Sequence, residues 1–144
     1  MKRSAVLLTA ALAASATLVA TNALAQGRPF AAVLTGAAEV PGPGDPDGTG
    51  EVFMTLNPGR SEICYQLTVS DIAPATAAHI HVGTSTEAGP VVVGLTPPTG
   101  GSSSACASVD RDLIKAIMQS PQNYYVNVHN PEFPAGAIRG QLAK

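Results

Sequence analysis

Residues 124–142 read YYVNVHNPEFPAGAIRGQL, two extended segments around a turn rich in proline and glycine. In the first segment two sets of residues alternate, namely Tyr124, Val126 and Val128 with Tyr125, Asn127 and His129. Such alternation is typical of a β-strand that turns one face toward a core. The stretch therefore predicts two β-strands joined by a tight turn, with His129 on the polar face of the first strand.

A second segment carries histidines in the same kind of pattern. Residues 78–83 read AHIHVG, so that Ile80 and Val82 face one side of a strand while His79 and His81 face the other. All three histidines of the chain are therefore expected on polar strand faces. Since residues two apart on a strand project from the same face, His79 and His81 can hold one ion, and His129 can complete the set if its strand is a neighbour.

The other elements are also mostly strands. Alternation and turn residues predict a strand over residues 29–35 that continues through 36–40, and a hairpin of strands over 51–56 and 62–69. The uninterrupted apolar run 90–95 favours a strand that is buried or paired on both sides. One helix is expected over 110–119, because Asp110 can cap its first turn and apolar residues follow at helical spacing.

Five blocks of the sequence carry a resemblance to a known family. They are GAAEVP at 36–41, AAHIHVG at 77–83, AGPVV at 88–92, YYVNVH at 124–129 and PAGAIRGQL at 134–142. Together they resemble the CHRD domain, named after its repeats in chordin, over nearly all of residues 26–144. The resemblance implies a single CHRD domain with a mainly β fold, an antiparallel β-sandwich of Greek-key or immunoglobulin-like topology. It implies no settled biochemical activity.

The first 25 residues have the pattern of a secretory signal peptide. Lys2 and Arg3 precede an apolar run over 5–20 that is short for a membrane span, and small residues follow at Ala23-Leu24-Ala25. We expect cleavage after residue 25, no membrane insertion of residues 26–144, and a secreted or periplasmic location. An uncleaved anchor helix is the alternative.

Charge argues against nucleic acid as a partner. The chain has 8 Lys and Arg against 10 Asp and Glu residues, and cleavage would remove Lys2 and Arg3. The remaining basic residues are scattered along the sequence at Arg28, Arg60, Arg111, Lys115, Arg139 and Lys144. Nucleic acids and anionic membranes are recognised by clusters of positive charge. We therefore expect neither of them as a partner.

Cys64 and Cys106 are the only cysteines of the chain. Export into an oxidising compartment favours a disulfide between them, which would join two strands of the sheet. A thiolate metal ligand is the alternative, although no second sulfur lies close in sequence as a structural zinc site would require.

The histidines support a metal hypothesis and a structural one. Neutral imidazole suits copper or zinc, so His79, His81 and His129 are the candidate ligands, whereas in the structural alternative they hold nearby loops by hydrogen bonds. Asn127 and Glu132 can support the site in either case. Arg139 is expected to pair with a carboxylate, Glu132 or Glu39.

The HIHVG and GAIRG motifs also distantly resemble copper-zinc superoxide dismutases. Only three histidines are present, so the histidine sets for copper and zinc in that family cannot both be assembled. Dismutase activity is therefore expected less than metal binding alone.

No nucleophile stands beside a histidine in sequence and no G-x-S-x-G motif is present, which argues against an enzyme. The function expected is that of an exported, monomeric CHRD module with a binding or structural role and a protein or glycan partner. The alternative is an extracytoplasmic protein that binds copper or zinc through the three histidines.

Overall fold

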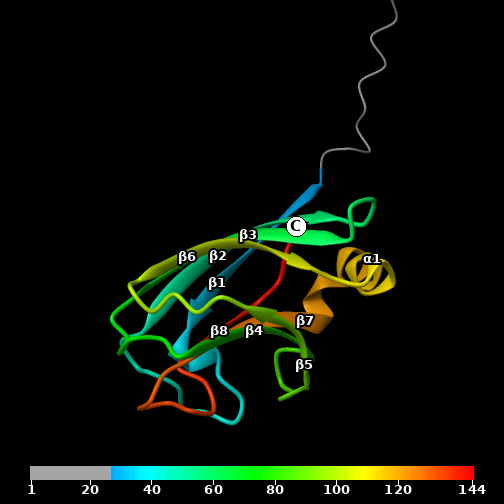
Figure 1. Ribbon diagram of the computed structural model, residues 1–144. Coiled ribbons are helices and arrows are strands. Elements are labelled where there is room, and N and C mark those ends of the chain that lie inside the picture. Colours follow the sequence, from blue (N-terminus) through cyan, green and yellow to red (C-terminus); the bar gives the residue numbers. More distant parts are fainter. Residues whose placement is uncertain (1–26) are drawn as a thin grey trace, which may run out of the picture.

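The structure is a computed structural model and describes residues 27–144 (Figure 1). The expected signal peptide, residues 1–25, lies outside the described residues. The strands are β1 (Arg28–Thr35), β2 (Thr49–Asn57), β3 (Glu62–Ser70), β4 (Ala77–Val82), β5 (Val91–Leu95), β6 (Ser102–Ser108), β7 (Tyr124–His129) and β8 (Ile138–Gln141). The helical elements are α1 (Arg111–Gln119) and the 3₁₀ turns η1 (Gly36–Ala38) and η2 (Pro121–Asn123).

The strands form one antiparallel sheet in the order β5-β4-β7-β8-β1-β2-β3-β6. The sheet folds over on itself, so that β1, β2, β3 and β6 lie opposite β8, β7, β4 and β5 (Figure 1). The two halves are joined at β1 and β8, where Thr35 pairs with Arg139. An isolated bridge between Ala31 and Ala143 adds a second link. The expectation of a mainly β, antiparallel fold with one short helix is confirmed.

The core lies between the two halves of the sheet. In the expected hairpin strands every second residue is buried, except the partly buried Val69. In β4 and β7 the core residues include Ile80, Val126 and Val128. Helix α1 packs Ile114 and Ile117 against this core. Its first turn is capped by Asp110, whose side chain accepts hydrogen bonds from the backbone N–H groups of the second and third residues that follow it. Burial of each such large aliphatic side chain contributes about 1.5–3 kcal/mol to stability.

The expected disulfide is present. Cys64 in β3 and Cys106 in β6 are direct cross-strand partners, and their sulfur atoms are bonded at 2.05 Å. Both sulfur atoms are used in this bond, so the thiolate alternative does not apply to this state of the protein.

Two expectations about strands are wrong. Residues 36–38 form the turn η1 instead of continuing β1, because the carbonyl oxygen of Gly36 accepts hydrogen bonds from the backbone N–H groups of Glu39 and Gly44. Strand β5 is an edge strand, and Val91 is 50% exposed, so the apolar run there is paired on one side only. A run of valines indicates β structure but does not determine the position of the strand in the sheet.

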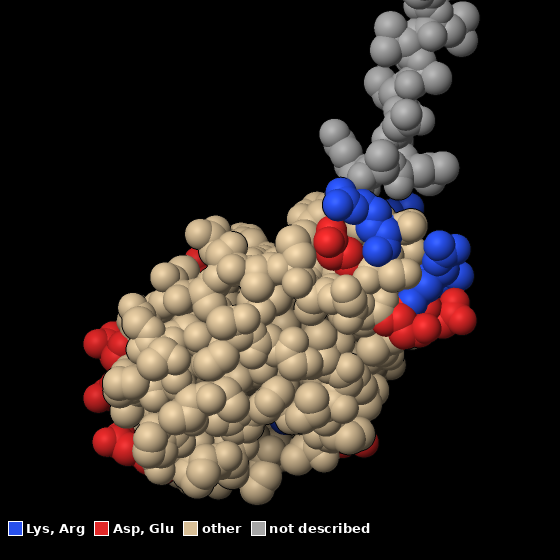
Figure 2. All heavy atoms as spheres, viewed as in Figure 1, with Lys and Arg blue, Asp and Glu red and all other residues tan. Residues whose placement is uncertain are grey.

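Basic side chains gather at the end of the molecule that carries the C-terminus and α1 (Figures 1 and 2). Arg28, Lys115 and Lys144 line one hollow there. Arg28, Lys115 and Lys144 are thus distant in sequence but close in space, whereas Arg139 is buried on β8. Lys115 and Arg60 each lie beside an acidic residue, Asp112 and Glu62 respectively. Within residues 27–144 no helix has the length and apolar character needed to cross a membrane.

Candidate functional site

The histidines lie on the face of β4, β7 and β8 that points away from the core. Strand register places His79 opposite Asn127, and Asn127 opposite Arg139. In the next row His81 lies opposite Tyr125. The face forms because β-strands alternate their side chains, and the alternate residues of the same strands fill the core.

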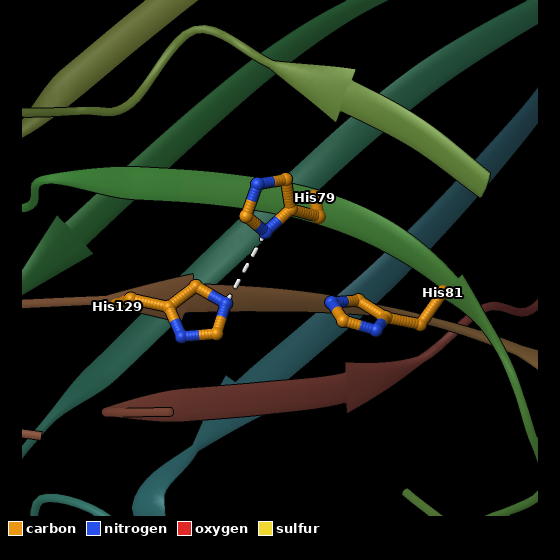
Figure 3. A group of neighbouring side chains, drawn as sticks. All are labelled: His79, His81 and His129. Atoms are coloured by element: carbon orange, nitrogen blue, oxygen red, sulfur yellow. Dashed lines mark hydrogen bonds between the residues drawn. The ribbon is translucent and has the colours of Figure 1, made fainter. Parts of the chain in front are cut away.

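The three imidazoles converge on one point (Figure 3). One ring nitrogen from each of His79, His81 and His129 lies within 4.8 Å of the others. The closest approach is 3.3 Å, between Nδ1 of His79 and Nε2 of His129. The sequence placed all three on polar faces, and the structure shows that β4 and β7 are neighbours, which brings the rings together.

Backbone carbonyl groups select the tautomers of two of these histidines. Nδ1 of His81 lies 2.8 Å from the carbonyl oxygen of Gly89, and Nδ1 of His129 lies 3.2 Å from that of Pro134. A carbonyl oxygen only accepts hydrogen bonds, so both Nδ1 atoms carry a proton and both Nε2 atoms carry a lone pair. Nε2 of His81 is buried and has no hydrogen-bond partner. The lone pair of His81 Nε2 is thus free in the shared space, whereas Nε2 of His129 lies 3.3 Å from Nδ1 of His79.

The environment also favours the uncharged imidazoles. Burial lowers the pKa of His79, and the neighbouring His129 and His81 lower it further. Burial likewise lowers the pKa of His129, against an opposing effect of its hydrogen bond to Pro134. Because a metal binds the neutral ring, these shifts favour ligation in neutral solution.

The other predicted site residues have different roles. Asn127 is buried and its Nδ2 donates to Oε2 of Glu39 over 3.1 Å. Among the described residues Arg139 lies within ion-pair distance of neither Glu132 nor Glu39, so of the expected pairing only an electrostatic interaction with Glu39 is present. Its guanidinium group instead donates to the carbonyl oxygen of Thr84 over 2.6 Å, while Glu39 acts on it electrostatically from farther away.

Glu39 is an unusual buried carboxyl group, only 6% exposed. Burial raises its pKa from 4.5 to about 7, although the hydrogen bond from Asn127 and the charge of Arg139 oppose this shift. No pattern in the sequence around Glu39 predicts this burial. Its burial arises from η1 and from Gly44 and Gly136, which lie against its side chain and leave no room for a Cβ atom.

Tyr125 and Gly89 were not among the predicted site residues. The ring of Tyr125 stacks on that of His81, with centroids 4.8 Å apart and planes at 10°. The alternation of β7 places Tyr125 on the same face as His129, and that signal could have identified it. The contact of Gly89 with His81 depends on the path of a loop, which alternation does not describe.

The comparisons with known proteins agree with the blocks quoted above. The sequence profile of the CHRD domain matches residues 30–142, nearly the whole described chain. Neither the comparison with curated proteins nor that with solved structures gives a match. A match of this extent shows the family, and the chain belongs to the CHRD domain family.

Proposed function

We propose that this chain is an exported protein that binds a copper or zinc ion through His79, His81 and His129. The observation that carries the proposal is the convergence of one nitrogen from each ring within 4.8 Å. The selection of the His81 and His129 tautomers by backbone carbonyls supports it, since metal-ligating histidines characteristically donate their other N–H to such a group.

The spacing of the nitrogens is close to that of a metal centre. Zinc–nitrogen bonds of 2.0–2.1 Å place two ligands of a tetrahedral site about 3.4 Å apart. The separation of 3.3 Å between Nδ1 of His79 and Nε2 of His129 already fits this value, and the nitrogen of His81 lies within 4.8 Å of both. Three neutral nitrogen ligands suit zinc or copper better than they suit calcium or magnesium, which prefer oxygen.

The disulfide and the first 25 residues support the exported location. Disulfides such as Cys64–Cys106 persist in oxidising compartments, and the N-terminal pattern is that of a signal peptide. Mass spectrometry of the protein from its native compartment should show a chain that begins at Gln26. A full-length mass would contradict export by cleavage.

Calorimetry with metal-free protein tests the binding site. Zinc and copper(II) should each be titrated into residues 26–144 and into three variants, His79→Ala, His81→Ala and His129→Ala. Loss of a direct ligand should weaken binding by more than about 100-fold, the upper range for loss of a residue that only supports a ligand. Gln66→Ala, an exposed change on β3, is the matched control and should bind like the wild type.

Circular dichroism should show that all the variants fold, because the core occupies the opposite strand faces. Absence of uptake of either metal by the wild type would overturn the proposal. The histidines would then have a structural role, and a binding module with a macromolecular partner would be the better account.

A further inference from the structure

Residues 83–90, here called the strap, lie against side chains of the histidine face. The strap leaves the end of β4, and its first residues contact β8, which lies two strands away beyond β7. Its last residues return to β4, where the backbone N–H of Val82 donates to the carbonyl oxygen of Pro90 over 3.1 Å. The strap therefore contacts side chains from all three strands of this face, namely His81 of β4, Tyr125 of β7 and Arg139 and Gln141 of β8.

Two side chains of β8 hold the beginning of the strap. Arg139 donates from Nη2 to the carbonyl oxygen of Thr84 over 2.6 Å. Gln141 donates from Nε2 to the carbonyl oxygens of Gly83 and Gln122, each over 2.7 Å. Arg139 is only 1% exposed, so its contact with the strap is shielded from water.

The end of the strap holds His81. The carbonyl oxygen of Gly89 accepts the proton of His81 Nδ1, and the backbone N–H of Gly89 donates to the hydroxyl oxygen of Tyr125 over 3.1 Å. A Cβ atom on Gly89 would lie 1.5 Å from the carbonyl oxygen of Val82, so only glycine fits this close approach. The position of Gly89 thus sets the tautomer and the orientation of His81.

Arg139 also acts on His81 through an aromatic ring. Its Cζ atom lies 3.4 Å from the centroid of the Tyr125 ring, which is itself stacked on His81. A guanidinium group over an aromatic face is attracted by the ring and restricts its movement. Arg139 therefore contacts both structures that hold His81, the strap and Tyr125.

We propose that Arg139 is a positioning residue of the histidine site, which acts through the strap and Tyr125 to keep His81 in the Nδ1–H tautomer with Nε2 directed at the shared point. The inference rests on the proposed function where it concerns metal affinity. The part of the inference that concerns the tautomer of His81 in metal-free protein does not depend on metal binding. Gln141 assists by holding the same end of the strap.

The test compares Arg139→Gln with the wild type by two measurements. Long-range ¹H–¹⁵N NMR of metal-free protein should show His81 as one tautomer in the wild type and as a mixture in the variant. Zinc affinity should fall by about 10- to 100-fold, as for loss of groups that orient metal ligands. Arg60→Gln, a change at an exposed residue of the β2–β3 hairpin, is the matched control and should alter neither readout.

Two milder variants keep the test decisive if Arg139→Gln fails to fold. Tyr125→Phe removes the hydroxyl group that holds Gly89 but keeps the stacked ring, and Gln141→Ala releases only one tether of the strap. In both variants the NMR spectra should show a smaller fraction of the second His81 tautomer than in Arg139→Gln.

The outcomes separate the two proposals. If the wild type binds no metal but the variants still mix the His81 tautomers, the proposed function fails and the positioning role stands. If folded variants keep a single His81 tautomer and bind zinc like the wild type, the positioning role is refuted.

Discussion

Nδ1 of His79 lies 3.3 Å from Nε2 of His129, across the neighbouring strands β4 and β7. Nδ1 of His129 donates to Pro134, so its Nε2 can only accept in the neutral ring. His79 must then be the donor, with its proton on Nδ1. A metal ion bound between the two rings has to replace this proton.

Zinc should therefore change the tautomer of His79. In metal-free protein all three histidines should carry the proton on Nδ1, whereas zinc-bound His79 should carry it on Nε2. The ¹⁵N chemical shifts of the rings report this change directly. If zinc binds while His79 keeps its Nδ1 proton, this nitrogen is not the ligand.

Metal release should require mildly acidic solution. Burial holds the pKa values of His79 and His129 below the ordinary value of 6.5, so ligand protonation competes with the metal only at lower pH. A titration with a colorimetric chelator should show metal retained at neutral pH and lost as pH falls below 6.5. Release at higher pH would mean that other groups control binding.

The same shifts affect the stability of metal-free protein. The unfolded histidines take up protons near 6.5, before the folded ones do, so the unfolded state binds more protons below that pH. These two residues should therefore contribute a loss of unfolding free energy as pH falls through this region and no change above it. His79→Gln should reduce this dependence, as measured by urea unfolding.

Glu39 should have the opposite effect on stability. Its pKa is 4.5 when unfolded and about 7 when folded, so the folded state binds an extra proton between these values and loses stability as pH rises through them. Glu39→Gln removes this dependence. Its unfolding free energy relative to the wild type should rise by about 3 kcal/mol between about pH 4 and about pH 8.

Urea unfolding at the two pH values measures this difference. Glu51→Gln, at an exposed carboxyl group of β2, is the control and should give a much smaller change. A difference for Glu39→Gln that does not vary with pH would contradict the raised pKa.

Loss of the disulfide should be costly and non-additive. The bond closes a loop with a sequence separation of 42 residues. Such a loop corresponds to about 4 kcal/mol of unfolding free energy in the chain-entropy model. Cys64→Ser, Cys106→Ser and the double variant should lose similar amounts, because each removes the same bond. Summed losses in the double variant would contradict this account.

The helix cap offers a smaller and independent test. Asp110 accepts hydrogen bonds from two N–H groups in the first turn of α1, at 2.8 and 3.2 Å. Asp110→Ala should lower the unfolding free energy by about 1 kcal/mol. Asp110→Asn and Asp110→Ser should lower it much less, because Asn and Ser side chains also cap helices. Equal losses in all three variants would show that capping is not the cause.

The sequence by itself determined which residues face the core and which do not. Alternation in 78–83 and 124–129 placed the histidines opposite the buried residues, because side chains of a strand project to two sides in turn. Helix α1 followed from Asp110 and its apolar spacing, and the disulfide followed from the two cysteines. The strand faces and the helix depend on local geometry, and the disulfide can form only between the two cysteines of the chain.

Only the tertiary structure decided that the histidines meet. Their convergence requires β4 beside β7 in a register that pairs His79 with Asn127, and a slip of one residue would turn His129 to the other face. The edge position of β5, the burial of Glu39 and the path of the strap also depend on contacts between distant segments. Strand order and loop path follow from the packing of the whole core. A pattern within one segment does not specify which distant segment will lie beside it.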